Sequence, residues 1–266
     1  MNNNEKSELG ENGKDNNNET SELGESEEQV GDVDPFQSQP VKLMFAFLEL
    51  INSQPFIYER IINTGNVAIE IFKALNIKIT PELIIASYGA NIGFIAMPHN
   101  IILKQTHLTE KEYGIIKQHP YISADKAERI YFNSLEDMSY INKLIENGSE
   151  TELNAIFEEK NNNFEYIKEI ILNHHELPLG KGYYQKSSGT SKESYIVGIA
   201  DRFAGAVNGF SSLYKAVMPA ARAAEEVVRH LFNNTQLFTN ADIKDENDKP
   251  IFDSELYIIK NLLENI

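Results

Sequence analysis

Two adjacent histidines, His174 and His175, are the residues of this sequence best suited to chemistry. Apolar side chains from Phe164 to Ile171 recur before them at spacings of three and four, which is typical of one face of a helix. Pro178 cannot continue that helix. The pair is therefore expected at a last helical turn, where two neutral imidazoles can converge on one metal ion. The alternative is one hydrogen-bonded core histidine and one solvated helix cap.

Two more residues complete a candidate ligand set. His119 stands at a predicted helix end before Pro120, and Asp201 is embedded in an apolar segment, where a carboxylate must be paired or bound to a cation. Three imidazoles and a carboxylate suit one divalent metal ion, either iron, manganese or zinc. The alternative is that His119 is a surface cap and Asp201 an N-cap or salt-bridge partner, with no metal bound.

The segments that must position these residues are predicted to be helices, and strand signals are scarce. Apolar periodicity predicts helices over 41–51, 57–75, 124–132, 152–175, 195–210, 219–232 and 256–263. Start signals predict two more: Thr80–Pro81 opens one that runs towards Asn91, and a capping box at Thr109–Glu112 opens one that ends at His119. Gly65 weakens the helix prediction for 57–75, and residues 161–163 weaken the prediction for 152–175. Residues 133–150 and 239–250 are polar. The sequence predicts an all-α fold.

The N-terminal region differs in composition from the rest of the chain. Residues 2–11 return almost unchanged as 16–25, and acidic side chains dominate. So few apolar residues cannot bury enough surface to order the segment. We expect residues 1–38 to form a disordered, low-complexity acidic tail and residues 39–266 to form one helical domain.

The charge and composition exclude several classes of protein. A formal net charge of -16 argues against binding to nucleic acid polymers and to anionic lipid. The absence of cysteine excludes disulfides and thiolate metal sites. No run of about 18 apolar residues and no signal peptide are evident, so neither a membrane span nor export is expected. The expected location is the cytoplasm.

Four blocks in order resemble the HD-GYP family, a branch of the HD metal-dependent phosphohydrolases. The blocks are residues 92–104, Leu108-Thr-Glu-Lys-Glu112 through Lys117-Gln-His-Pro120, His174-His-Glu176 with Gly180-Lys-Gly-Tyr183, and Ala200-Asp-Arg-Phe203, and they lie within about 55–232. The resemblance implies an HD-domain-like helical bundle with His119, His174, His175 and Asp201 at metal-ligand positions. Active members hydrolyse cyclic di-GMP at a centre of two or three metals, which generate hydroxide and clamp the phosphate.

The chain departs from the family pattern at the residues on which that chemistry depends. The departures are Ala90-Asn91 at the HD dyad, Phe94 where a lysine is expected, Arg60 near an early histidine ligand, Tyr184 in place of proline, and apolar residues near Phe210 in place of arginine. Two divalent ions about 3.5–4 Å apart repel by roughly 16–19 kcal/mol at an effective dielectric near 20. The neutral amide of Asn91 cannot offset this, so the sequence predicts one metal ion or none, with Asn91 at most a weak ligand.

The prediction for function is a catalytically silent or weak HD-GYP-like domain. It would act in cyclic di-GMP signalling, either as a sensor of the cyclic dinucleotide or as a scaffold for a signalling protein. Lys181, Tyr183 and Lys215 are the expected phosphate or nucleotide contacts, although lysines in a basic loop can equally be solvated. One alternative is an active phosphodiesterase with an atypical, metal-poor site. Another is an unrelated helical protein without a ligand site.

Overall fold

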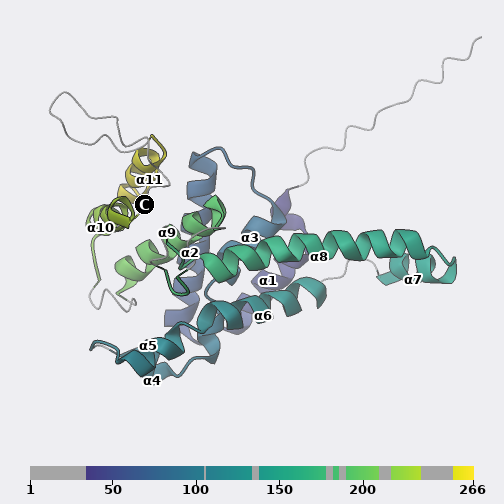
Figure 1. The fold of residues 1–266 in the computed structure, drawn as a ribbon, viewed down its shortest axis with the longest axis horizontal. Coiled ribbons are helices and arrows are strands. Elements are labelled where there is room, and N and C mark those ends of the chain that lie inside the picture. Colours follow the sequence, from purple (N-terminus) through teal and green to yellow (C-terminus); the bar gives the residue numbers. More distant parts are fainter. Residues whose placement is uncertain are drawn as a thin grey trace, which may run out of the picture. The chain divides into compact units, whose positions relative to one another are not determined.

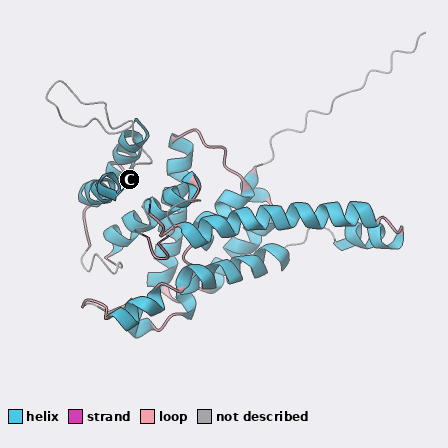
Figure 2. Ribbon diagram, in the orientation of Figure 1, coloured by secondary structure: helices cyan, strands magenta, loops and turns pink. Residues whose placement is uncertain are grey.

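Every regular element that the computed structural model describes is a helix (Figure 1, Figure 2). The described residues are 34–104, 106–133, 138–177, 182–185, 190–209, 217–234 and 254–266. No strand occurs among them, which confirms the predicted all-α class. None of the helices in these ranges has the length and apolar character needed to cross a bilayer.

Residues 34–266 form one unit, whose first described element is a short 3-10 turn. The helices in chain order are η1 (Pro35–Gln37), α1 (Gln39–Leu50), α2 (Pro55–Ala74), α3 (Pro81–Gly89), η2 (Ile92–Ala96), α4 (His99–Ile102), α5 (Glu110–Ile116), α6 (His119–Asn133), α7 (Met138–Glu146), α8 (Glu150–Asn173), α9 (Lys192–Asn208), α10 (Ala220–Asn234) and α11 (Ser254–Glu264). The helical unit thus includes residues 34–38, which the sequence assigned to the tail. The rest of that predicted tail and the connector 239–250 lie outside the described residues.

The predicted helix-start signals are confirmed at two positions. The hydroxyl oxygen of Thr80 accepts a hydrogen bond from the amide of Leu83 at 3.3 Å. The capping box is formed in both directions, since Thr109 Oγ1 accepts from the amide of Glu112 and the Glu112 carboxylate accepts from the amide of Thr109. Local chemistry therefore fixes where α3 and α5 begin.

Several helical segments differ from the sequence prediction. The helix opened by Thr109 ends at Ile116, and His119 begins α6 instead of ending that helix. The polar stretch 133–150 contains α7, because Ile141 and Leu144 are three residues apart and both are buried. Helix α8 runs unbroken through residues 161–163. Relative to alanine, each asparagine destabilises a helix by an amount between a few tenths of a kcal/mol and about 0.7 kcal/mol. The packing of Phe164 and Ile167 in the core is sufficient to keep the helix continuous.

Helix α2 packs against both α3 and α9, and α8 packs against α3, α6 and α9 (Figure 1). Gly65 does not interrupt α2. An added Cβ at Gly65 would lie 2.3 Å from the ring of Tyr88 on α3, so only glycine allows this approach. The Tyr88 hydroxyl then donates to Asn66 Oδ1 at 2.6 Å. This packing brings the middle of α2, the start of α6, the end of α8 and the middle of α9 together around one buried polar group.

Candidate metal centre

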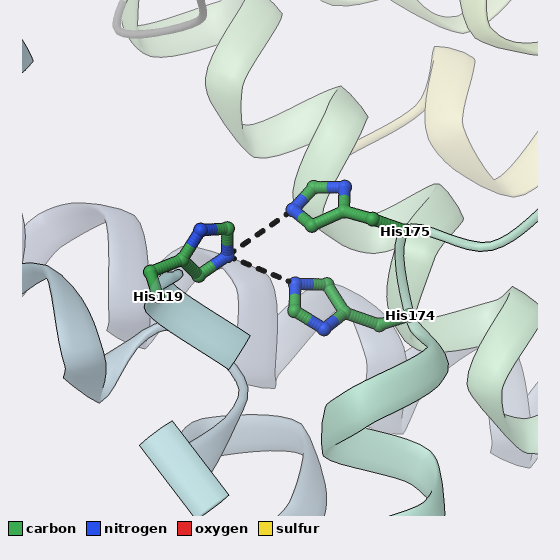
Figure 3. A group of neighbouring side chains, drawn as sticks. All are labelled: His119, His174 and His175. Atoms are coloured by element: carbon green, nitrogen blue, oxygen red, sulfur yellow. Dashed lines mark hydrogen bonds between the residues drawn. The ribbon is translucent and has the colours of Figure 1, made fainter. Parts of the chain in front are cut away.

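Three histidines from two separate segments point toward one another in the core (Figure 3). Nε2 of His119 lies 3.3 Å from Nε2 of His174 and 3.2 Å from Nε2 of His175. One ring nitrogen from each histidine lies within 4.8 Å of those of the other two, and all three residues are buried. The three side chains could hold one metal ion, as the sequence predicted.

Backbone carbonyls fix the protonation of two of the rings. Nδ1 of His119 lies 2.7 Å from the carbonyl oxygen of Ile116, and Nδ1 of His174 lies 2.6 Å from that of Ile171. A carbonyl oxygen only accepts, so both neutral rings carry their proton on Nδ1 and present an Nε2 lone pair. The two lone pairs face each other at 3.3 Å, and Nε2 of His175 lies 3.2 Å from that of His119. Metal-ligating histidines use this tautomer of His119 and His174, in which one ring nitrogen donates its proton to a carbonyl and the other is free to bind the metal.

Two of the three separations between the nitrogens fit a tetrahedral ion, and the third, between His174 and His175, is within 4.8 Å. Metal–nitrogen bonds of 2.0–2.1 Å place the ligands of a tetrahedral zinc ion about 3.3–3.4 Å apart. The 3.2 and 3.3 Å separations around His119 Nε2 agree with that value. Imidazole nitrogens suit zinc and iron, whereas manganese favours oxygen ligands. Of the three predicted metals, the donor set therefore fits zinc and iron best.

Burial keeps the histidines in the neutral form that metal binding requires. It lowers the pKa of His119 to about 3, and the neighbouring His174 adds to the effect. Burial likewise lowers the pKa of His174, and it lowers the pKa of His175 well below its ordinary value. Proton competition for the lone pairs is therefore weak near pH 7.

Asp201, the fourth predicted ligand, is held by an arginine. Arg60 Nη2 donates to both carboxylate oxygens, at 2.7 Å to Oδ1 and 2.8 Å to Oδ2, and Arg60 Nε donates to Oδ1 at 3.0 Å. The structure thus contains the salt bridge that the sequence left open as an alternative. Oδ2 still lies 3.6 Å from His175 Nε2, so the carboxylate borders the histidine group. The role of Asp201 as a ligand stays a prediction.

The charge of Asp201 is stable in this buried position. Burial, the largest single effect, raises the pKa of the carboxyl, but the Arg60 guanidinium, His174, His119 and the hydrogen bond from Asn91 together outweigh it, and the net pKa lies below its usual value. Both residues are buried, and α2 supplies the arginine while α9 supplies the aspartate. The pocket therefore contains a fixed pair of opposite charges beside three neutral imidazoles.

Asn91 connects this pair to α2 and leaves one atom without a partner. Its Nδ2 donates to Asp201 Oδ1 at 2.7 Å and to Thr64 Oγ1 at 3.2 Å. The reverse amide orientation would press an oxygen against the carboxylate, so the assignment is fixed by charge. Asn91 Oδ1 is buried and has no hydrogen-bond donor among the described residues. Such an acceptor suits a weak neutral ligand or a metal-bound water, which agrees with the minor role predicted for Asn91.

Two aromatic rings cover the histidines. Phe94 stacks on His119 with centroids 4.2 Å apart, and Tyr183 stacks on His175 at the same separation. Tyr183, which was predicted to contact a nucleotide, therefore packs directly on a candidate ligand. Burial raises the pKa of its hydroxyl. The predicted phosphate contacts Lys181 and Lys215 lie outside the described residues.

Hydrogen bonds hold the segment 182–185 over the centre. The amide of Tyr184 donates to Glu176 Oε1 at 2.7 Å, and its hydroxyl bonds to the carbonyl oxygen of Lys117. The Lys117 ammonium in turn donates to the carbonyl oxygen of Tyr183 at 3.3 Å. The first bond gives the buried Glu176 carboxylate a donor, and the other two hold the segment against Lys117.

Sequence reasoning missed the glycines that make room for the histidine backbone. A Cβ added at Gly198 would lie 2.1 Å from the carbonyl oxygen of His174, and one at Gly93 would lie 2.3 Å from that of His119.

Sequence reasoning also missed the part played by Arg60. The available signal was an arginine on the same helical face as Ile57 and Ile61, because a buried cation in an apolar stripe requires a carboxylate partner.

No protein-family model, no curated protein and no solved structure matches the chain. The resemblance to the HD-GYP family therefore stays a prediction. The histidine group itself rests on the geometry described above.

Proposed function

We propose that this protein is a degenerate HD-GYP-like domain that binds one metal ion and does not hydrolyse cyclic di-GMP. It acts as a sensor or as an interaction scaffold in signalling linked to that nucleotide. The observation that carries the proposal is the buried ion pair between Arg60 and Asp201, beside three histidines with converging nitrogens.

Retention of one metal is supported by the histidine group. The Nε2 lone pairs of His119 and His174 face each other, and a shared cation removes their repulsion. Zinc or iron bound by His119, His174 and His175 would act as a Lewis acid and would tie the start of α6 to the end of α8. A metal in this position is a link between helices whether or not any substrate is turned over.

Loss of hydrolysis is supported by the groups beside that site. Phosphodiester hydrolysis by paired metals depends on carboxylates that hold the two ions a few ångströms apart. Here Asp201 Oδ1 already accepts three hydrogen bonds, from Arg60 and Asn91, and Asn91 carries no charge. Phe94 provides an aromatic face where the resembling family has a lysine. Neither of the two described side chains hydrogen-bonded to Asp201 supplies a further carboxylate for a second ion.

The test combines elemental analysis of freshly purified protein with an assay of cyclic di-GMP hydrolysis. We expect one equivalent of zinc or iron per chain and no turnover. The His174→Ala variant should lose the metal, whereas His107→Ala, which changes an exposed histidine, should retain it. Two or more equivalents with turnover would overturn the proposal, and a protein free of metal would point to a scaffold without a ligand site.

Turnover with one ion would favour the alternative of an atypical phosphodiesterase, provided that His174→Ala abolishes it. Isothermal titration with cyclic di-GMP separates the two versions of the silent domain. Heat at micromolar nucleotide indicates a sensor, and no heat at high micromolar nucleotide indicates a scaffold.

A further inference from the structure

Arg60 places a permanent positive charge inside the centre. We infer that its guanidinium stands in for a second metal ion and limits the centre to one ion per chain. This inference rests on the proposed single-metal function and adds the residue that sets the ion count.

The guanidinium is hydrogen-bonded to the carboxylate that a second ion would need as a ligand. It donates three hydrogen bonds of 2.7–3.0 Å to the buried Asp201 carboxylate, two to Oδ1 and one to Oδ2. A bidentate arginine–carboxylate pair is fixed in geometry as well as in charge. A second metal could bind Asp201 only by displacing this buried cation from the carboxylate.

Arg60 is also held close to the histidines. Its Cζ lies 5.2 Å from the centroid of the Phe94 ring, and that same ring stacks on His119. Oδ2 of Asp201 in turn lies 3.6 Å from His175 Nε2. Phe94 alone therefore lies between the guanidinium and His119, and Asp201 alone lies between it and His175. The positive charge of Arg60 is thus within the centre.

The charges of the pocket explain why one ion is the limit. The three neutral imidazoles, the Asp201 carboxylate and the Arg60 guanidinium sum to zero, so a bound divalent ion gives these five side chains a charge of +2. A second divalent ion would raise it to +4 without any further carboxylate among the described groups that contact Asp201, because Asn91 is neutral. Removal of the arginine lowers each of these sums by one and frees both carboxylate oxygens.

A rival explanation is that the missing charge at Asn91 alone limits the ion count. The two explanations differ in what they predict for Asn91→Asp in the presence of Arg60. If Arg60 sets the limit, this variant still binds one zinc ion per chain. If the missing carboxylate sets the limit, it binds two.

The experiment loads each protein with zinc, removes excess metal by dialysis and measures zinc per folded chain, with folding checked by circular dichroism. We expect one ion in the wild type, one in Asn91→Asp and two in the double variant Arg60→His with Asn91→Asp. The matched control is Arg60→Lys with Asn91→Asp, which keeps the positive charge and should stay at one ion.

Two zinc ions in Asn91→Asp, or one in the folded Arg60→His double variant, would overturn the inference. A wild type without zinc would overturn the proposed function as well, so the two failures are distinguishable. If the variants do not fold, crystals of the wild type soaked in excess Zn²⁺ decide the matter by anomalous scattering at the zinc edge. A second ion at Asp201 would overturn the inference, and a single ion at the histidines would support it.

Discussion

The carbonyl oxygen of His174 lies 2.1 Å from the position that a Cβ on residue 198 would occupy. Gly198 is one turn before Asp201 on α9, so this approach sets the distance between a candidate metal ligand and the Arg60–Asp201 pair. The centre therefore depends on a residue that has no side chain to contribute.

Gly198→Ala is expected to destabilise the protein and to weaken metal binding. A buried Cβ at 2.1 Å from a backbone atom forces α9 and the end of α8 apart, and overpacking of this kind lowers the free energy of unfolding by about 1–3 kcal/mol. Urea denaturation and zinc titration measure the two effects. The control is Gly114→Ala on α5, where nothing lies within 4 Å and helix propensity should raise stability by up to about 1 kcal/mol. Equal effects at the two glycines would contradict the packing described here.

Arg60→Met is expected to lower the free energy of unfolding at pH 7 by roughly 3–5 kcal/mol, because it leaves the buried Asp201 carboxylate without its cation. In the variant the largest effect that opposes burial is gone, so the pKa of Asp201 rises. Its deficit relative to the wild type should therefore shrink as the pH falls and the carboxyl is protonated. Urea denaturation at pH 7 and pH 5 measures this difference.

The surface pair of Arg129 with Asp125 is the control for that substitution. Both side chains are mostly exposed, so Arg129→Met should change stability little. A deficit as large as that of Arg60→Met would show that charge removal at any site, rather than burial, accounts for the loss.

The stability of the metal-free protein should fall as the pH falls below about 6.5. The pKa of His119 is about 3 in the folded state, and those of His174 and His175 are also lowered, whereas each is about 6.5 when unfolded. The unfolded chain therefore binds more protons in this window. Between pH 7.5 and 5.5 His119 should account for a loss of about 1.4 kcal/mol, and His174 and His175 should add to the loss in the same direction.

Urea denaturation in chelator at these two pH values measures the loss. In His174→Gln the loss should be smaller by the contribution of one histidine, whereas His107→Gln, at an exposed position, should match the wild type. A stability that does not depend on pH in this range would mean that the histidines are protonated in the folded core.

Zinc should raise the melting temperature of the metal-free protein. An ion that binds only the folded state stabilises it by RT ln(1 + [L]/Kd), which is about 2.7 kcal/mol at a hundredfold excess over Kd. His175→Ala should abolish this stabilisation, because it removes one of three converging nitrogens. Differential scanning calorimetry with and without zinc tests the expectation, and a rise that persists in the variant would place the ion elsewhere.

Much of the helical fold is determined locally and could be predicted. Thr80 and the Thr109–Glu112 capping box satisfy free amides within one turn, so short-range chemistry fixes the helix starts. The helix ahead of His174 follows from apolar spacing. The helix α7 was missed because its nine residues lie inside a longer polar stretch, 133–150. The helical spacing of Ile141, Leu144 and Ile145 was present in the sequence, but it is confined to this short segment.

The amino-acid sequence by itself determined the all-α class, the helix caps and the identity of three histidines able to bind a metal. Only the tertiary structure decided that His119 meets two histidines 55 and 56 residues away, and that Arg60 neutralises an aspartate 141 residues away. The physical reason is range: caps and periodic faces act within a few residues, whereas buried charges choose partners only when packed helices bring them within hydrogen-bond distance.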